Sequence, residues 1–406
     1  MKRYDAIVVG AGPAGSTAAY RLATAGASVL LLDRATFPRE KPCGGGVTLR
    51  AARLVPFPLD PVVEDVVGRV ELRLGYARRY ERGDGRPLIL MTRRRRLDHF
   101  LAERAANAGA EFRDGVKASG VEDGRDAVTV AVGGERISGR TLIGADGVNG
   151  VVGRAAELGG NRAVGVALEG NVPYERLRGR YRGRAVLELG ILPGGYGWVF
   201  PKGDHVNIGL GGWEREGPRL RGELARLCSE HSVSVDDVTG LRGYRLPCRL
   251  PDSRLSRGRV LLVGDAAGLI DPLTGDGMYE AFLSAKLAAD AVLDLLAGGA
   301  DSLAAYDERL SSLLARHLWA SWGVKEALDR FPRAAFALSR LPAVWRVVER
   351  VVRGELRDVT EARGLARPPL KALALLALAA GDPGRAYRDR ERRGVAVTMG
   401  RWRAIS

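Results

Sequence analysis

A glycine-rich turn between two apolar runs near the N-terminus constrains the fold of this chain more than any other feature. Residues 6–9 are apolar, positions 10–15 read Gly-Ala-Gly-Pro-Ala-Gly, and small residues predict a helix over residues 16–25. A second apolar run, residues 29–32, ends on Asp33. Strand, glycine turn, helix, strand and acid in this order are typical of a Rossmann-type unit that binds a dinucleotide.

The residues of this turn each have a physical role in such a unit. Gly10 permits the sharp turn, Gly12 lets the backbone approach a pyrophosphate, and Gly15 lets the helix pack close to the sheet. The helix start, which includes Ala14, offers free N–H groups and a partial positive charge to the anion. The Asp33 carboxylate can accept hydrogen bonds from ribose hydroxyls and would repel a 2′-phosphate, which favours FAD or NAD over NADP. A glycine turn without a ligand is disfavoured, because three glycines in one turn cost backbone entropy.

Composition narrows the class of protein and its partners. The chain has 406 residues, enough for two or three substructures, and a net charge of +15 that comes almost entirely from arginine. No nucleic-acid motif accompanies this charge, so nucleic acid is not expected as a partner. The positive charge either attracts the chain to an anionic membrane surface or to an acidic electron-donor protein, or it reflects a compositional bias that has no function.

The cysteines and the hydropathy pattern indicate the compartment. Three cysteines form neither a disulfide framework nor a metal-ligand spacing, so we expect a reducing compartment and no metal. No signal peptide is evident, and no uncharged apolar run reaches the length of about 18 residues that a spanning helix needs. We therefore expect a cytoplasmic protein, either free or peripheral on the inner face of the membrane.

An irregular loop follows the first unit. Two prolines and a glycine triplet within residues 34–46 exclude a regular element there, and glycine backbone can pass close to a flat cofactor. Arg34, Cys43, Gly44 and Gly45 are therefore candidate cofactor-binding residues. Cys43 is either a small buried residue or lies near the cofactor, where it shapes or protonates the reactants.

Two further features point to the same cofactor. Four arginines at positions 93–96 precede a helix, and they form either a solvated run or include one, Arg94, that reaches a phosphate or ring oxygen. An expected strand over residues 136–143 ends at Gly-Ala-Asp-Gly, which places Asp146 at the mouth of a strand, where ligands of open α/β sheets bind.

The middle of the chain changes character. Residues 163–250 alternate as antiparallel strands do, and one of these strands would place Tyr196, Trp198 and Phe200 on one face, followed by Pro201. These rings are either sheet core or a broad apolar wall for a greasy or planar substrate.

A second strong motif follows an expected strand over residues 259–263. Gly264 and Asp265 end that strand, where the carboxylate can bind a polyol chain, and a long helix is expected over residues 278–296. The helix start offers N–H groups and a positive end to a reduced flavin ring. The candidate ligand-binding residues of the intervening turn are Pro272, Gly275, Gly277 and Met278.

The C-terminal hundred residues are expected to be helical. Residues 331–357 and 370–380 are apolar with flanking arginines, and they either pack as core helices or form an interfacial membrane patch. Residues from 387 onward are expected to be a loosely held basic tail.

The expected fold class is α/β: a discontinuous Rossmann-like FAD-binding domain, an inserted antiparallel-sheet substrate domain and a helical C-terminal region. Their respective ranges are residues 1–55, 92–160 and 255–300; residues 56–91 and 161–254; and residues 301–406.

The N-terminal fingerprint, Gly144-Ala145-Asp146-Gly147 and Gly264-Asp265 together resemble the flavoprotein hydroxylase fold of the p-hydroxybenzoate hydroxylase type. Within that fold the chain is most similar to the geranylgeranyl reductase family. The loop over residues 38–46, the Tyr-Gly-Trp-Val-Phe-Pro strand, the turn over residues 272–277 and the spacing of Arg94 and Asp98 carry this resemblance. Two departures, Asp276 in place of a frequent glutamate and Ser284-Ala285 in place of Ser-Gly, leave the length of the substrate open.

The resemblance implies an FAD-dependent reduction of isoprenoid double bonds on a lipid, quinone or chlorophyll-like acceptor. The aromatic wall would stabilise a cation-like transition state and exclude water, which makes Trp198 and Tyr196 candidate catalytic residues. Cys43, Tyr196 and a flavin-bound water are candidate proton donors. The electron donor is either transiently bound NAD(P)H or a ferredoxin-like protein, since no second dinucleotide fingerprint is visible.

Two other functions fit the same fold. One is an FAD-dependent monooxygenase that hydroxylates an aromatic or polyketide-like molecule, and the other is a flavin-binding protein without turnover. The halogenase variant is disfavoured, because the Trp-x-Trp-x-Ile-Pro signature is replaced here by residues 196–201.

Overall fold

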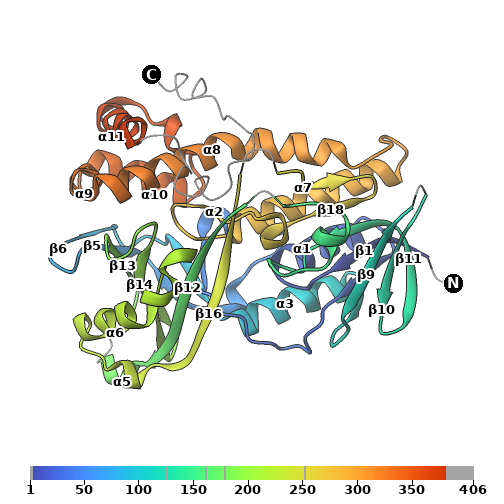
Figure 1. Ribbon diagram of the computed structural model, residues 1–406, viewed down its shortest axis with the longest axis horizontal. Coiled ribbons are helices and arrows are strands. Elements are labelled where there is room, and N and C mark those ends of the chain that lie inside the picture. Colours follow the sequence, from blue (N-terminus) through green and yellow to red (C-terminus); the bar gives the residue numbers. More distant parts are fainter. Residues whose placement is uncertain (1–2, 125, 161, 178–179, 251–252, 381–406) are drawn as a thin grey trace.

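The computed structural model describes residues 3–124, 126–160, 162–177, 180–250 and 253–380. Within these ranges the chain forms an eight-stranded sheet, a seven-stranded sheet, a small three-stranded sheet and a set of helices (Figure 1). This arrangement confirms the expected α/β class, with a Rossmann-like sheet, an antiparallel sheet and C-terminal helices.

The eight-stranded sheet carries the N-terminal motif. Its main path runs β17-β18-β11-β1-β2-β8, and β10 joins β11 to β9. Strand β1 is parallel to β2 and β11, and β11 is parallel to β18, so the carboxyl ends of four strands meet at one edge. The strands are β1 (Arg3–Val9), β2 (Val29–Leu32), β8 (Glu111–Arg113), β9 (Ala118–Asp123), β10 (Val128–Val132), β11 (Glu135–Gly144), β17 (Ser256–Arg257) and β18 (Val260–Leu262).

Apolar residues hold this sheet against its helices. Helix α1 (Pro13–Thr24) packs against both α3 (Arg94–Asn107) and α7 (Met278–Leu296). The helix expected over residues 16–25 begins at Pro13, because proline suits the first helical position, where its missing N–H is not needed. The helix expected over residues 278–296 is confirmed as α7.

The seven-stranded sheet runs β16-β12-β15-β14-β13-β5-β6. Its pairs are antiparallel except for β13, which is parallel to β5, so the expectation of antiparallel strands holds for that strand only on its β14 side. The strands are β5 (Arg69–Leu74), β6 (Arg78–Arg82), β12 (Arg162–Pro173), β13 (Arg184–Leu189), β14 (Tyr196–Lys202), β15 (His205–Trp213) and β16 (Thr239–Arg249).

The third sheet and several further helices are shorter. The small sheet consists of β3 (Gly46–Thr48), β4 (Val63–Val67) and β7 (Ile89–Thr92). The short helices are α2 (Leu49–Ala52), α4 (Val152–Ala155), α5 (Tyr174–Leu177) and α6 (Leu220–Glu230), with a 3-10 helix η4 (Gly264–Ala267) at the second motif.

Four helices form the described C-terminal part: α8 (Ala304–Arg330), α9 (Pro332–Ser339), α10 (Pro342–Val352) and α11 (Arg367–Ala380). In Figure 1, α8 runs beside α7, and α9, α10 and α11 gather at its C-terminal end. The apolar stretch 331–357 is divided because Pro342 begins a new helix. No helix in the described ranges combines the length and the hydropathy that crossing a membrane requires. The expected basic tail from residue 387 lies outside the described residues.

Candidate functional site

The glycine turn is as tight as its sequence predicts. Gly10 has a φ of 107°, and a Cβ there would lie 2.2 Å from the carbonyl oxygen of Ala145. A Cβ on Gly15 would lie 1.8 Å from the carbonyl oxygen of Gly10. Both glycines are therefore required by close backbone packing.

Gly12 faces a different environment. It is the N-cap of α1 and carries no side-chain cap, and a Cβ there would lie 3.6 Å from Nη2 of Arg39 and 3.9 Å from Nη2 of Arg94. The helix start and two guanidinium groups thus surround one space. This donor set fits the pyrophosphate of a dinucleotide.

Arg94 differs from the other arginines of its run because it is buried. Its Nε and Nη2 donate to the two carboxylate oxygens of Asp98 at 2.7 and 2.8 Å, and Nη1 of Arg39 lies 3.0 Å from the same carboxylate. Burial favours the neutral guanidinium, but Asp98 outweighs it and holds the pKa of Arg94 above its usual value. Arg94 lies beside Gly12, whereas Arg95 and Arg96 are exposed, and its contact with a phosphate remains a prediction.

The carboxylates of two predicted ligand-binding acids accept hydrogen bonds from backbone N–H groups. Asp33 accepts hydrogen bonds from the N–H groups of Ala11 at 2.8 Å and Ala35 at 2.9 Å, so it holds the glycine turn. Its ribose contact remains a prediction, as does any contact of the exposed Arg34.

Asp146 points into its own loop. It accepts hydrogen bonds from the N–H groups of Val151 and Val152, at 2.5 and 3.0 Å, beside the start of α4. One oxygen of this carboxylate thereby orders the turn after β11, because the N–H groups at that helix start need an acceptor. The expected contact of Asp146 with a ligand remains a prediction.

The second motif meets the first in space. A Cβ on Gly264, whose φ is 55°, would lie 3.0 Å from Cβ of Ala14. Asp265 pairs with Lys41, whose Nζ lies 2.9 Å from Oδ2. Burial raises the pKa of Asp265, but Lys41 more than compensates and the net shift is downward, so the carboxylate is ionised. Lys41 has no assigned role in the sequence prediction.

The turn after η4 carries a cluster of ionisable groups. His317 Nε2 lies 3.2 Å from Oδ2 of Asp271 and 3.7 Å from Oε1 of Glu280. Burial raises the pKa of Glu280 well above its usual value, and burial also raises the pKa of Asp276 to about 6. One ligand atom each of Asp271, Glu280 and His317 lies within 4.8 Å of the others, and the Asp271–His317 pair connects the turn to α8.

This cluster supports the remaining predicted residues of the second motif. Pro272 and Met278 are buried, and Gly275 has a φ of 63° that favours glycine. Gly277 is the N-cap of α7, but the N–H of Met278 at the helix start donates to Oδ1 of Asp276 at 2.9 Å, so that N–H is not free as the sequence predicts.

The loop of Cys43, Gly44 and Gly45 lies on the aromatic strand β14. A Cβ on Gly44 would lie 3.0 Å from the ring of Phe200, and one on Gly45 would lie 2.1 Å from the carbonyl oxygen of Thr92. Only glycine at these positions lets the loop approach the ring and the neighbouring backbone so closely.

The three rings of β14, which we call the aromatic row, form one continuous face. The centroids of Tyr196 and Trp198 are 6.0 Å apart, and Trp198 stacks on Phe200 at 6.3 Å. Trp198 is 6% exposed and donates from Nε1 to Oδ1 of Asn207 at 2.7 Å, whereas the other two rings are half-buried. Tyr196 donates its hydroxyl proton to the carbonyl oxygen of Thr274. Pro201, at the end of the row, is buried.

A groove leads away from Tyr196. It has a volume of about 210 Å³ and passes between the β13–β14 connection and the end of α8. Most of its lining is apolar, including Leu189, Ile191, Leu192, Pro193, Leu273 and Leu328, with Lys325 and Asp329 as charged members.

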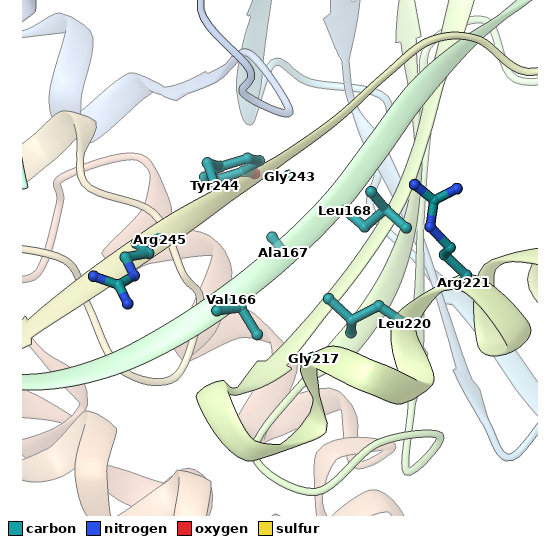
Figure 2. Close-up of a pocket in the computed structure, with 9 residues that line it drawn as sticks. All are labelled: Val166, Ala167, Leu168, Gly217, Leu220, Arg221, Gly243, Tyr244 and Arg245. Atoms are coloured by element: carbon teal, nitrogen blue, oxygen red, sulfur yellow. The ribbon is translucent and has the colours of Figure 1, made fainter.

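A larger cavity, of about 330 Å³, lies elsewhere. Figure 2 shows Val166, Leu168 and Leu220 between β12 and α6, with Arg221 and Arg245 at opposite ends. No predicted site residue lines it, so its volume does not identify the functional site.

Sequence reasoning missed the buried polar residues around Cys43. Glu169 of β12 and Lys202 of β14 are 5% and 6% exposed, and both contact the peptide of Cys43. The only local signal was the position of Lys202 directly after the aromatic strand. No local pattern singles out Glu169, because its partner lies 126 residues away.

Comparisons with known proteins agree with this geometry. A model of the NAD(P)-binding Rossmann-like domain matches residues 8–40. A geranylgeranyl diphosphate reductase of Rhodobacter capsulatus is 33% identical over 310 residues, which cover 73% of this chain and 77% of that protein. Digeranylgeranylglycerophospholipid reductase 1 of Methanopyrus kandleri is 33% identical over 326 residues, which cover 72% of this chain and 81% of that protein.

A solved structure has the same fold. The geranylgeranyl bacteriochlorophyll reductase-like protein of Thermoplasma acidophilum matches with a TM-score of 0.74 at 23% identity, over 96% of this chain and 99% of that chain. Together with this fold, the reductases at 33% identity identify an FAD-dependent oxidoreductase. The chain belongs to the geranylgeranyl reductase family.

Proposed function

We propose that this protein saturates double bonds of a geranylgeranyl or polyprenyl group carried by a lipid, quinone or chlorophyll-like acceptor. The observation that carries the proposal is the aromatic row, which the Cys43 loop meets on one side and an apolar groove meets at its Tyr196 end. Relatives named as reductases of geranylgeranyl diphosphate and of a digeranylgeranylglycerophospholipid support the isoprenoid class.

The aromatic row suits the electronic demand of this reaction. Reduced FAD, when bound, would supply a hydride to the alkene carbon at which positive charge develops as a proton adds to the second carbon. The faces of Tyr196, Trp198 and Phe200 attract positive charge and, because they are apolar, exclude water. The groove is smaller than the roughly 300 Å³ of a typical ligand pocket, so it suits one segment of a long chain.

A proton must join the second carbon. Tyr196 has its proton engaged with the carbonyl oxygen of Thr274, and burial raises its pKa further above the usual value. Cys43 instead accepts a hydrogen bond at Sγ from the N–H of Gly45 at 3.3 Å, which leaves its own proton free. We therefore assign the proton donor to Cys43.

The test follows the bound flavin under anaerobic conditions. The protein is reduced with dithionite and mixed with geranylgeranyl diphosphate, a menaquinone or a geranylgeranylated lipid. We expect flavin reoxidation and a product that is heavier by one pair of hydrogens for each double bond saturated. A hydroxylated product that forms only with oxygen would instead support a monooxygenase, and no reoxidation with any alkene or arene would support a binding protein without turnover.

The electron donor is tested in the same cuvette. NADH, NADPH and a reduced ferredoxin are each added to oxidised enzyme in place of dithionite. The donor that bleaches the flavin absorbance within a turnover time is the physiological class, and the basic charge of the chain favours an acidic donor protein.

We further propose that the C-terminal helices bring the site to an anionic membrane, where such substrates reside. Leu365, in the 3-10 helix directly before α11, is 83% exposed, and Leu375 of α11 is 64% exposed. Helix α11 also carries Arg367 and Lys371. Exposed apolar side chains among basic ones bind anionic lipid surfaces.

Vesicle binding measures this attachment. Sedimentation with phosphatidylglycerol vesicles should retain the protein, and the double variant Leu365→Glu, Leu375→Glu should bind at least about tenfold more weakly, since each buried leucine contributes about 1.5 kcal/mol or more. Val235→Glu is the matched control, because Val235 is 36% exposed but lies outside the C-terminal helices. Equal binding of all three proteins would contradict the assignment.

A further inference from the structure

Two buried ionisable side chains hold the backbone N–H and the backbone carbonyl oxygen of one residue, Cys43. The N–H of Cys43 donates to Oε1 of Glu169 at 2.6 Å, and Nζ of Lys202 donates to the carbonyl oxygen of Cys43 at 2.7 Å. Both side chains come from the rigid seven-stranded sheet, whereas Cys43 lies in an irregular loop. The sheet thereby imposes its geometry on the loop.

Burying these two charged groups costs free energy, which indicates that the arrangement has a function. Burial raises the pKa of Glu169 and lowers the pKa of Lys202, and the charge of each partly offsets the effect on the other. Removing a charge from water costs several kcal/mol even after relaxation. Backbone groups of an ordinary surface loop would be satisfied by water without this cost.

Further contacts restrict how far Cys43 can move. The hydroxyl of Tyr244 donates to Oε2 of Glu169 at 3.3 Å, which fixes the carboxylate from a third strand. A Cβ on Gly45 would lie 2.7 Å from Cε of Lys202, so the lysine stem passes directly over the loop. Gly44 in turn lies against Phe200. The direction of the Cys43 side chain is thus set relative to the aromatic row.

We propose that Glu169 and Lys202 are positioning residues, which orient Cys43 toward the substrate carbon and stabilise the thiolate that remains after proton transfer. The inference rests on the proposed function. In the step, the S–H bond breaks and the alkene π pair forms a C–H bond with its proton, so that positive charge develops at the neighbouring carbon, which takes the hydride that reduced FAD would supply. The Lys202 ammonium balances the thiolate until solvent reprotonates it. The other titratable groups that interact electrostatically with Cys43 are Arg94, Tyr196 and Tyr244.

The reactivity of Cys43 provides a readout that does not depend on turnover. Holoenzyme is alkylated with iodoacetamide across a pH series, and the modification of each cysteine is measured by peptide mass spectrometry. Cys43 is half-buried, whereas Cys228 and Cys248 are buried and serve as internal references. We expect Lys202→Met to change the rate of Cys43 alkylation across the series, because the loop loses the donor that holds the Cys43 carbonyl oxygen.

A matched lysine controls for burial. Lys325 is also 6% exposed and donates to a backbone carbonyl, that of Gly194, at 2.5 Å, but it does not contact Cys43. The Lys325→Met protein should keep the wild-type alkylation profile of Cys43, with Cys228 as the reference, because Lys325 interacts electrostatically with Cys248. Lys202→Gln, which retains an N–H donor, replaces Lys202→Met if that protein does not fold. An unchanged Cys43 profile in both Lys202 variants would overturn the proposal.

Turnover tests the positioning role. Lys202→Met and Glu169→Ala should keep the visible flavin spectrum and lose about 100-fold in kcat, since a displacement of about 1 Å at a reacting group has an effect of this size. Glu169→Gln should lose less than about tenfold, because its amide oxygen still accepts the Cys43 N–H. Equal losses in the Gln and Ala variants would refute the hydrogen-bonding role of Glu169.

A double variant separates this inference from the proposed function. Adding Lys202→Met to Cys43→Ser should slow turnover no further than Cys43→Ser alone, because residues that act as one unit are not additive. Additive losses would contradict the positioning role. If wild-type enzyme saturates no prenyl substrate, the proposed function fails, whereas the alkylation profiles still decide whether Lys202 and Glu169 control Cys43.

Discussion

The Asp265→Ala protein should purify without the yellow colour of bound FAD. Asp265 is the ionised carboxylate at the carboxyl edge of the main sheet, and we propose that it accepts hydrogen bonds from the polyol chain of the cofactor. Loss of a hydrogen bond to a charged group costs about 1.5–3 kcal/mol, which corresponds to about 10- to 100-fold weaker binding. Titration of the apoprotein with FAD, followed by flavin fluorescence, measures this change.

A second ion pair in the same protein provides the control. Lys286 and Asp290 of α7 are also 2.9 Å apart, and their side chains are 42% and 41% exposed. Asp290→Ala therefore removes a comparable pair outside the site and should leave the protein yellow. A stoichiometric yellow preparation of Asp265→Ala would show that the second motif does not hold the cofactor.

The Trp198→Ala protein should retain FAD and lose turnover. Trp198 is the central ring of the aromatic row and is held by Asn207 and by the ring of Phe200. A desolvated cation–π contact contributes about 2 kcal/mol, so its loss should slow the reaction about 30-fold, and admission of water should slow it further. Single-turnover reoxidation of the reduced flavin by the prenyl substrate is the measurement.

Removing a buried indole also costs stability, by about 3–5 kcal/mol, and this effect needs its own control. Trp345 is 8% exposed and donates from Nε1 to Glu349 at 2.9 Å, but it lies on α10 outside the aromatic row. Trp345→Ala should lower the melting temperature by a similar amount and keep turnover per bound flavin. Unchanged turnover in Trp198→Ala would make this ring ordinary sheet core. Trp198→Phe, which keeps a ring without the N–H, should retain most of the rate.

Local patterns predicted the parts of the site that depend on local geometry. The turn at Gly10 and Gly15, the start of α7 and the aromatic face of β14 each follow from spacing within a few residues, because strand alternation and glycine conformations are short-range properties. The parallel strands then bring the first and second motifs to one sheet edge, as that class of fold requires.

The motifs predicted the positions of individual side chains but not their hydrogen-bond partners. Asp33 and Asp146 stand where the motif predicts, yet Asp33 accepts the N–H of Ala11 in the glycine turn and Asp146 accepts the N–H of Val151 in its own turn. Among four consecutive arginines, burial alone distinguishes Arg94, and burial is decided by what packs above the helix.

The sequence by itself determined the class of fold, the cofactor-binding turn and the strand that carries the aromatic row, because each is written in residues that are neighbours along the chain. Tertiary structure alone decided which groups meet. Lys41 reaches Asp265 across 224 residues, and Glu169 reaches Cys43 across 126. Such contacts depend on how two sheets pack against one loop, and no periodic residue pattern along the chain predicts that packing.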